Sequence, residues 1–202
     1  MRYEEYAKKL ADDYLKSGII DGKNFPDIEL YIDQMAKSLN KELYLYGDGK
    51  TGPITKAMIS NYTKHQMIPG PTGKHYTKDH LIFMTLVFYL KGCFSMDEIR
   101  RLMKPLLEDY SSKWDEPIDF VSMYGEIIDF VKKTEADLPR RLEQQISDVK
   151  KFLANRDSAD DDTSELMMLI TTLVMRSNAE RFIAEKLLDE YFESLKKGTK
   201  KK

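Results

Sequence analysis

The sequence predicts a mainly helical protein, with an N-terminal helical region followed by a C-terminal helical bundle. Apolar residues recur at three- and four-residue spacings along most of the chain, which is the period of amphipathic helices. Ser, Thr and Asp residues precede several of these stretches, and Gly and Pro clusters follow them, as helix caps and breaks require. The 202 residues, 42% of them hydrophobic, can form one large or two small domains with a sizeable core.

Composition narrows the class of protein. Lys and Arg total 32 against 34 Asp and Glu, so a nucleic-acid site has to rest on local charge. The single cysteine, Cys93, excludes an internal disulfide framework and is expected to be a buried thiol. The start of the chain carries no secretory signal, and the apolar runs 81–90 and 166–175 have about half the length of a membrane span. We expect a cytoplasmic protein without membrane contact.

The first two helices are predicted at residues 3–16 and 27–43. Each carries its apolar residues on one stripe, which should face the core. Asp27, just after Phe25-Pro26, is expected to cap the second helix. The Gly- and Pro-containing stretch 47–53 is predicted to be a loop.

Residues 54–108 predict a compact module. Thr55 can cap a short helix to about His65, and the Pro-rich segment 67–76 should end it and form a tight hairpin or loop, which we interpret as a small wing. Thr77 can cap the next helix, which ends at Gly92. Ser95-Met96-Asp97-Glu98 matches a capping box that begins a helix from 96 to about 107.

A domain boundary is predicted near residue 109, so that residues 1–108 form the N-terminal region and residues 109–202 the C-terminal domain. The polar segment 109–116 holds the single tryptophan, Trp114. Beyond it, helices are predicted at 118–131, 138–153 and 164–195, with an exposed acidic loop at 155–162 and a frayed basic tail at 196–202.

Two stretches of the C-terminal domain predict helix packing. Leu138, Leu142, Ile146, Val149 and Leu153 alternate by fours and threes, the spacing of a helix that packs along one seam. Residues 166–175 are apolar nearly all round and are expected to form the central helix of a bundle. Either stretch could join a homodimer or pack inside one monomer, and for the second we favour internal packing.

The sharpest local signal for function lies between residues 50 and 80. This stretch contains five lysines and one acidic residue, a net charge of +4. All three histidines fall in it or at its end. Such a cluster is the expected footprint of a phosphate-facing surface, although it is also common on proteins that bind no nucleic acid. The candidate DNA-binding residues are Lys56, Ser60, Asn61, Tyr62, Lys64, His65, Lys74, His75 and Tyr76.

The apolar residues of the same module predict its core rather than a binding surface. They are Ile59, Tyr62, Met67, Ile68, Tyr76 and Leu81. The histidines and Cys93 match no zinc-site spacing, so we expect exposed or half-buried histidines and no metal. No phosphate-binding glycine loop, nucleophile elbow or redox cysteine pair is present in the sequence, and we expect no enzyme and no cofactor.

The order and spacing of these motifs resemble MerR-type regulators. Those proteins have a Ser- or Thr-capped helix ending in an aromatic pair, then Gly-Leu-Leu-x-Pro, a short wing, and Gly-Phe-Ser-x-x-Glu-Ile. The corresponding segments are Thr55 to Tyr62, Met67-Ile68-Pro69, Lys74-His75-Tyr76, Asp79 to Leu81, and Gly92 to Ile99. The resemblance implies that Thr55 caps a recognition helix, that Ser60, Asn61 and Lys64 face the major groove, and that Lys74 and Tyr76 contact the DNA backbone.

Residues 32–35, 55–64 and 74–81 look closer still to the bacterial family of domain of unknown function 1836. That resemblance implies a helical protein with a MerR-like DNA-binding half, and the family has no assigned biochemical role. Three positions depart from the MerR pattern. Ser60 replaces an arginine, Asn61 replaces the first aromatic residue, and Gln66 replaces the turn glycine.

Two functions follow as expectations. The first is a transcription regulator that binds duplex DNA through the helix 55–65 and the wing 69–76, with the C-terminal half supplying dimerisation or the response to a small-molecule or protein effector. The alternative is an adaptor that keeps the winged-helix scaffold and binds proteins instead of DNA. The acidic isoelectric point near 6.0 and the missing arginine are consistent with this alternative.

Overall fold

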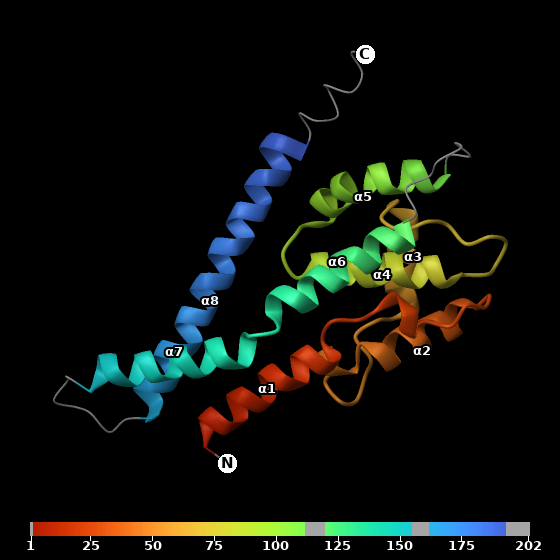
Figure 1. The fold of residues 1–202 in the computed structure, drawn as a ribbon. Helices are drawn as coiled ribbons and strands as arrows, with labels where there is room; N and C mark the ends of the chain where they lie inside the picture. The colour runs from red at the N-terminus through yellow and green to blue at the C-terminus, as the bar shows by residue number, and fades with distance from the viewer. Residues whose placement is uncertain (1, 112–119, 155–161, 193–202) are drawn as a thin grey trace. The chain divides into compact units, whose positions relative to one another are not determined.

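The computed structural model describes residues 2–111, 120–154 and 162–192, and most of this part is helical (Figure 1). The prediction of a mainly helical protein is therefore confirmed. None of the helices in these ranges is long and apolar enough to cross a membrane. The predicted features at Trp114, in the acidic stretch 155–161 and in the tail 196–202 lie outside the described residues.

The chain divides into two compact units. We call Ser17–Lys133 the central unit and Met1–Lys16 with Thr134–Lys202 the terminal unit. The helices are α1 (Tyr3–Ser17), α2 (Ile32–Glu42), α3 (Lys56–Lys64), α4 (Lys78–Lys91), α5 (Met96–Ser111), α6 (Phe120–Glu135), α7 (Leu138–Leu153) and α8 (Asp162–Leu187). Short 3-10 turns lie at Gly22–Asn24 and Tyr44–Tyr46, and a π-helical turn at Leu188–Phe192 follows α8.

This division differs from the predicted boundary after residue 108, because most of α6 belongs to the central unit. The Phe120 ring stacks on Phe83 of α4 with centroids 3.7 Å apart. The Tyr124 hydroxyl, buried in the core, donates a hydrogen bond to the Ile20 carbonyl at 2.8 Å. Burial raises the pKa of Tyr124 far above its ordinary value.

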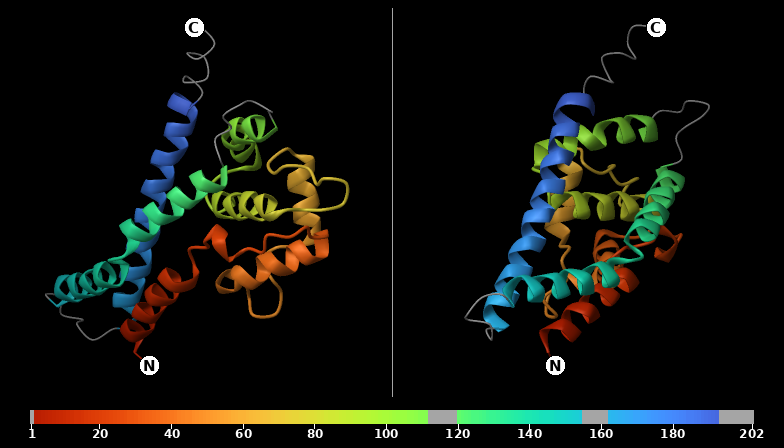
Figure 2. Two further views of the ribbon diagram at one scale, coloured as in Figure 1. Left: turned by 45° about the vertical axis from the view of Figure 1, so that its right-hand side comes forward. Right: turned by 60° about the vertical axis from the view of Figure 1, so that its left-hand side comes forward.

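Helix α4 is the central helix of the central unit. Residues 80–85 and Val87 are all buried, so α4 is covered nearly all round. Figure 2 shows α4 between α5 and α2, both of which contact it. The turn at Gly22–Asn24 also packs on α4, and a Cβ at Gly22 would lie 2.9 Å from Ile82 Cδ1. Glycine therefore allows the close approach of this turn to the helix.

Helix α2 begins at Ile32, five residues later than predicted. Leu30 and Tyr76 form an antiparallel bridge in which each amide donates to the other carbonyl at 2.8 Å, so the chain before α2 is extended. Asp27 therefore does not cap this helix. Instead the Gln34 side chain accepts a hydrogen bond from the Tyr31 amide at 2.9 Å.

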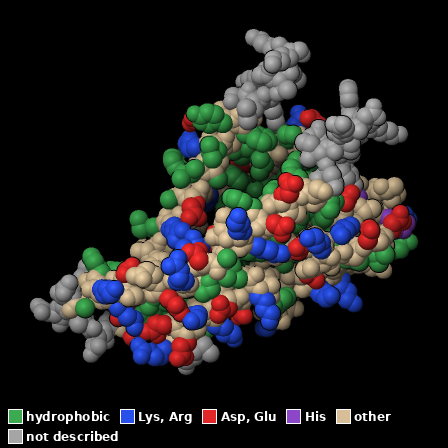
Figure 3. All heavy atoms as spheres, in the orientation of Figure 1, with side chains coloured by type: hydrophobic (Ala, Val, Ile, Leu, Met, Phe, Trp, Pro, Cys, Tyr) green, Lys and Arg blue, Asp and Glu red, His purple; other side chains and the backbone are tan. Residues whose placement is uncertain are grey.

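Helix α8 is not the buried central helix that the sequence predicts. Between residues 166 and 175 Leu169 is buried, whereas Met167 and Met175 are 65% and 66% exposed. Figure 3 shows hydrophobic side chains on the surface along this helix. Helix α7 packs against α8, and the Gln145 amide donates to the Thr172 hydroxyl at 2.8 Å. An all-round apolar helix needs neighbours on every side, and the exposed methionines show that α8 is not covered all round.

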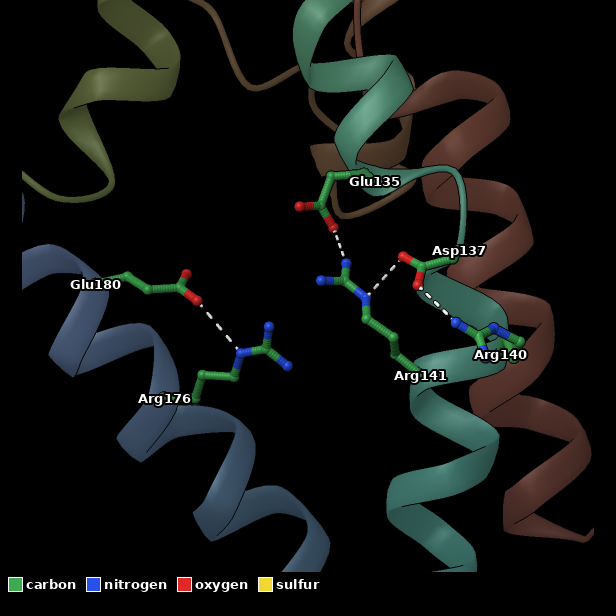
Figure 4. Close-up of polar contacts among 6 residues, drawn as sticks. All are labelled: Glu135, Asp137, Arg140, Arg141, Arg176 and Glu180. Atoms are coloured by element: carbon green, nitrogen blue, oxygen red, sulfur yellow. Dashed lines mark hydrogen bonds and ion pairs between the residues drawn. The ribbon is translucent and has the colours of Figure 1, made fainter.

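Polar contacts join the helices of the terminal unit. Lys150 of α7 forms an ion pair with Glu4 of α1, and the Tyr3 hydroxyl donates to Glu165 of α8 at 2.6 Å. Figure 4 shows Arg141 at the start of α7 between Glu135 and Asp137, with Asp137 3.0 Å from its Nε. The contacts of Lys150 and Tyr3 join α1 to α7 and to α8, and those of Arg141 join the start of α7 to the residues just before it.

Two smaller expectations are wrong. Cys93 is exposed, because it follows Gly92 in the turn between α4 and α5 rather than lying within α4. On α1 the predicted apolar stripe is only partly covered: Ala11 is buried, but Tyr6 and Leu10 are exposed. The predicted capping box at the start of α5 is confirmed, since the Ser95 amide donates to Glu98 and the Glu98 amide donates to the Ser95 hydroxyl.

Candidate nucleic-acid interface

Helix α3 turns a polar face outward. The Thr55 hydroxyl accepts a hydrogen bond from the Met58 amide at 3.2 Å, which confirms the predicted cap. Ile59 and Tyr62 are buried and fix the inner face of the helix in the core. The outer face consists of Lys56, Ala57, Ser60, Asn61, Lys64 and the C-cap residue His65, all exposed. No residue of α3 is acidic.

The start of α3 is held by Asn40 of α2. Its Nδ2 donates to the Ile54 carbonyl and its Oδ1 accepts from the Ile54 amide, both at 2.8 Å. Ile54 is itself buried. Because this contact uses both ends of one side-chain amide, it determines where the chain enters α3 relative to α2.

The end of α3 is a Schellman motif, not the proline-induced break that the sequence predicts. The Met67 amide donates to the Tyr62 carbonyl at 2.9 Å, and the Gln66 amide donates to the Thr63 carbonyl at 3.0 Å. Gln66 has a φ of +54°, the left-handed conformation that such an end requires. Glycine normally occupies this position because other residues adopt the conformation at a cost.

A tight hairpin turn follows. Thr72 and His75 exchange two backbone hydrogen bonds of 3.1 Å, which leaves Gly73 and Lys74 at the tip. Gly73 has a φ of +65°, as the first central residue of a type II′ turn requires. We call this segment the hairpin turn 72–75. Lys74 is exposed, and Tyr76, just beyond, is the bridge partner of Leu30.

His80 supports the hairpin from inside the core. The ring is 2% exposed, its Nδ1 accepts from the Thr77 amide at 3.0 Å, and its Nε2 lies 3.0 Å from the Gly70 carbonyl. Because Nδ1 accepts, Nε2 carries the proton and donates to Gly70. The expectation of exposed or half-buried histidines is therefore wrong for His80, which ties the start of α4 to the loop before the hairpin.

Two carboxylates from outside residues 50–80 lie on this surface. Asp33, in the first turn of α2, is 2.7 Å from the Lys56 ammonium. Glu29 is 3.5 Å from Nδ1 of His75, whose ring lies 4.8 Å from that of Tyr31. Residues 29–33 thus contact both the start of α3 and the hairpin turn, which places these two elements at one edge of the central unit.

The predicted site residues therefore divide into two groups. Seven reach the surface, and they are Lys56, Ser60, Asn61, Lys64, His65, Lys74 and the partly covered His75. Tyr62 and Tyr76 are 4% and 6% exposed, so they belong to the core and cannot touch a duplex. Burial also raises the pKa of Tyr62. All six predicted core residues of the module, both tyrosines included, are buried.

Sequence reasoning missed three residues that contact the candidate interface, namely Glu29, Asp33 and Asn40. Their roles depend on contacts 14 or more positions away along the chain, and no local motif marks them. Lys64 and Lys74 form no ion pair with any residue that the structure describes. Within the same ranges, no three His, Cys, Asp or Glu side chains are grouped so as to hold a metal ion.

One comparison with known proteins bears on this surface. The family model described as Domain of unknown function (DUF1836) matches residues 20–127, which is more than half of the chain. The match covers most of the central unit, including α2, α3, the hairpin turn 72–75 and α4. No curated protein and no solved structure matches the chain. The chain therefore belongs to the DUF1836 family.

Proposed function

We propose that the central unit binds duplex DNA through the outer face of α3 and the hairpin turn 72–75, and that the protein is a transcription regulator of MerR-like winged helix-turn-helix type. The observation that carries this proposal is the division of α3 into two faces. The inner face is fixed in the core by Ile59 and Tyr62, and the outer face holds polar and basic side chains without a carboxylate. A recognition helix needs this combination of a rigid mount and a polar reading face.

The order of elements supports the same function. In a winged helix-turn-helix the recognition helix follows a supporting helix and precedes the wing. Here α2 contacts α3, the hairpin turn 72–75 follows α3, and the Leu30–Tyr76 bridge attaches that turn to the chain before α2. We therefore propose the hairpin turn 72–75, with Lys74 at its tip, as the wing.

The outer face of α3 carries suitable groups for both kinds of contact. The Asn61 amide can pair with the N6 and N7 edge of adenine in the major groove, and the Ser60 hydroxyl can bond to a base or a phosphate. The ammonium groups of Lys64 and Lys74 can neutralise phosphates. These contacts would provide sequence reading from one helix and affinity from both elements.

Salt-dependent binding tests the proposal. Fluorescence anisotropy with a labelled random-sequence duplex, at about 50 and 200 mM salt, should show a steep loss of affinity at the higher salt. Replacing Lys56, Lys64 and Lys74 together by alanine should abolish most of the binding. The matched control replaces Lys9, Lys91 and Lys133, which are also exposed but lie on α1, α4 and α6. Equal losses in the two triple variants would contradict an interface at α3.

A second candidate function is protein binding, favoured by the exposed apolar side chains of α8. Met167, Ile170, Val174 and Met175 are each more than half exposed. Exposed apolar side chains gathered along one helix mark protein interaction surfaces more often than DNA contacts. An adaptor, or a regulator that forms a homodimer or receives its effector through this helix, would lose that association when Ile170 and Val174 become glutamate, whereas salt would weaken it little.

A further inference from the structure

We infer that Asp33 and Glu29 oppose phosphate binding at the candidate interface and thereby set how strongly the protein holds DNA of arbitrary sequence. This inference rests on the proposed function and concerns its selectivity. Each carboxylate lies against one cationic or potentially cationic group of the interface, Asp33 on Lys56 and Glu29 on His75. Both acids come from residues 29–33, a stretch that sits at the edge shared by α3 and the hairpin turn.

The Asp33–Lys56 pair occupies the place where a phosphate would bind. The carboxylate oxygen is 2.7 Å from Lys56 Nζ, and both side chains are more than 60% exposed. A DNA phosphate that bound Lys56 would have to displace this carboxylate or lie beside it. A phosphate beside Asp33 would lie well within the electrostatic screening length, which is about 10 Å at 0.1 M salt, so the two anions would repel each other. Lys56 is therefore available to phosphate only at an electrostatic cost.

Glu29 acts on the hairpin turn in the same way. Its carboxylate is 3.5 Å from Nδ1 of His75. The centre of the Tyr31 ring lies 4.8 Å from the centre of the same imidazole. A phosphate that approached the His75 imidazole would also meet the negative charge of Glu29. The neighbouring Lys74 forms no ion pair among the described residues and stays available.

The consequence is that the protein would distinguish its preferred DNA sequence from DNA of arbitrary sequence. Phosphate contacts supply nearly all of non-specific binding, whereas the base contacts of Ser60 and Asn61 depend on the sequence. Carboxylates that weaken the phosphate contacts at Lys56 and His75 reduce affinity for every duplex, and only a duplex that also satisfies α3 is retained. Repulsive groups at an interface are a recognised means of rejecting wrong partners. An exposed ion pair is weak enough for a well-fitting duplex to replace it.

The test compares D33N, E29Q and the double variant with the wild type, using the random-sequence duplex at about 50 and 200 mM salt. D33N should bind roughly threefold more tightly or better at the lower salt, and its salt dependence should steepen by about one phosphate contact. E126Q is the control, because it removes one exposed acid from α6, a helix that holds none of the candidate interface residues. In a K56Q background D33N should lose most of its effect.

The outcomes separate this inference from the proposed function. If the wild type binds in a salt-dependent way and D33N does not change that binding, or if E126Q tightens it equally, the inference is overturned and the DNA-binding function stands. If neither the wild type nor the double variant binds at the lower salt, the proposed function fails and the inference fails with it. Binding by the double variant alone would support the inference, since the interface would then be competent once the acids are removed.

Discussion

The side-chain amide of Asn40 forms two hydrogen bonds with the backbone of Ile54. Its Nδ2 donates to the Ile54 carbonyl and its Oδ1 accepts from the Ile54 amide, each at 2.8 Å. This contact links α2 to the residue just before the Thr55 cap of α3. A neighbouring feature makes the fit tight, because a Cβ at Gly52 would overlap the Asn40 side chain. The helix that we propose to read DNA is thus positioned by a polar residue that does not itself face the duplex.

Replacing Asn40 by alanine should destabilise the protein by about 2 kcal/mol, because two partly buried backbone groups of Ile54 lose their partners. DNA binding should fall as well, since α3 would no longer be held at a fixed angle to α2. Urea unfolding followed by circular dichroism measures the first effect. The matched control is Asn24→Ala, whose single hydrogen bond to Glu42 is exposed and should cost little. Equal effects from the two substitutions would contradict the role given to Asn40.

Replacing Gln66 by glycine should stabilise the protein by about 1 kcal/mol. Gln66 has a φ of +54°, and a residue with a Cβ adopts that conformation at a cost of about 1–2 kcal/mol, part of which the greater freedom of unfolded glycine offsets. Gln66→Ala keeps the Cβ and should bring no gain. Thermal unfolding of the wild type and the two variants measures these differences in stability. A loss of stability in the glycine variant would mean that the Gln66 side chain makes a stabilising contact that outweighs the cost of its backbone conformation.

The terminal unit should carry an acid-sensitive contact at Glu4. The hydrogen bond from Lys150, supported by that from Arg2, lowers the pKa of Glu4 from 4.5 to about 2. A carboxyl group whose folded pKa is depressed adds stability above its unfolded pKa, and this stability is lost as pH falls from about 4.5 towards about 2. The difference in unfolding free energy between wild type and Glu4→Gln should therefore be larger at about pH 7 than at about pH 3. A difference that stays constant with pH would exclude this ion pair as its source.

Asn61 should read one base. After selection of a preferred duplex from a random pool, Asn61→Ala should relax the preference at a single adenine and cost about 1–3 kcal/mol on the selected site. On random-sequence DNA the same variant should bind nearly as well as the wild type, because its phosphate contacts remain. Lys64→Ala is the useful comparison, since it should weaken binding to both duplexes. A uniform loss from Asn61→Ala would assign Asn61 to the phosphates instead.

The caps of α3 and α5, and the core residues of the module, could be predicted because they depend on neighbours three or four positions away. The Thr55 and Ser95 caps are of this kind. The start of α2 could not be predicted, because Leu30 is extended through a bridge to Tyr76, 46 positions further along the chain. Local helical propensity continues back to Asp27, and the long-range pairing overrides it.

Helices α4 and α8 show a second limit of sequence reasoning. Both contain a ten-residue apolar run. The run in α4 is buried at residues 81–85 and Val87, whereas much of that in α8 is exposed. Hydrophobic periodicity cannot distinguish the two helices. A helix that is apolar all round needs other elements packed against it, but its sequence does not show which elements these are. Within the central unit α2, α5 and the turn at Gly22–Asn24 supply that cover for α4.

Composition predicts which residues form the proposed interface, but it does not predict the charges around them. A count over residues 50–80 predicts a basic surface with one acid. Folding brings Asp33 to Lys56 and Glu29 to His75, which adds two negative charges that the count omits. The nine candidate DNA-binding residues also include Tyr62 and Tyr76, although both are buried, Tyr62 on the inner face of α3 and Tyr76 beside the Leu30–Tyr76 bridge. Burial and long-range pairing decide which members of a motif remain available.

The most direct test of the central claim is to map the contact surface by amide chemical shifts while a duplex is titrated into the labelled full chain. The account predicts that the largest changes fall on the outer face of α3, at Lys56, Ser60, Asn61 and Lys64, and at Lys74 in the hairpin turn 72–75. Buried Ile59 should change less. Changes confined to other helices, or none at a salt concentration near 50 mM where phosphate contacts are strongest, would contradict DNA binding by this surface.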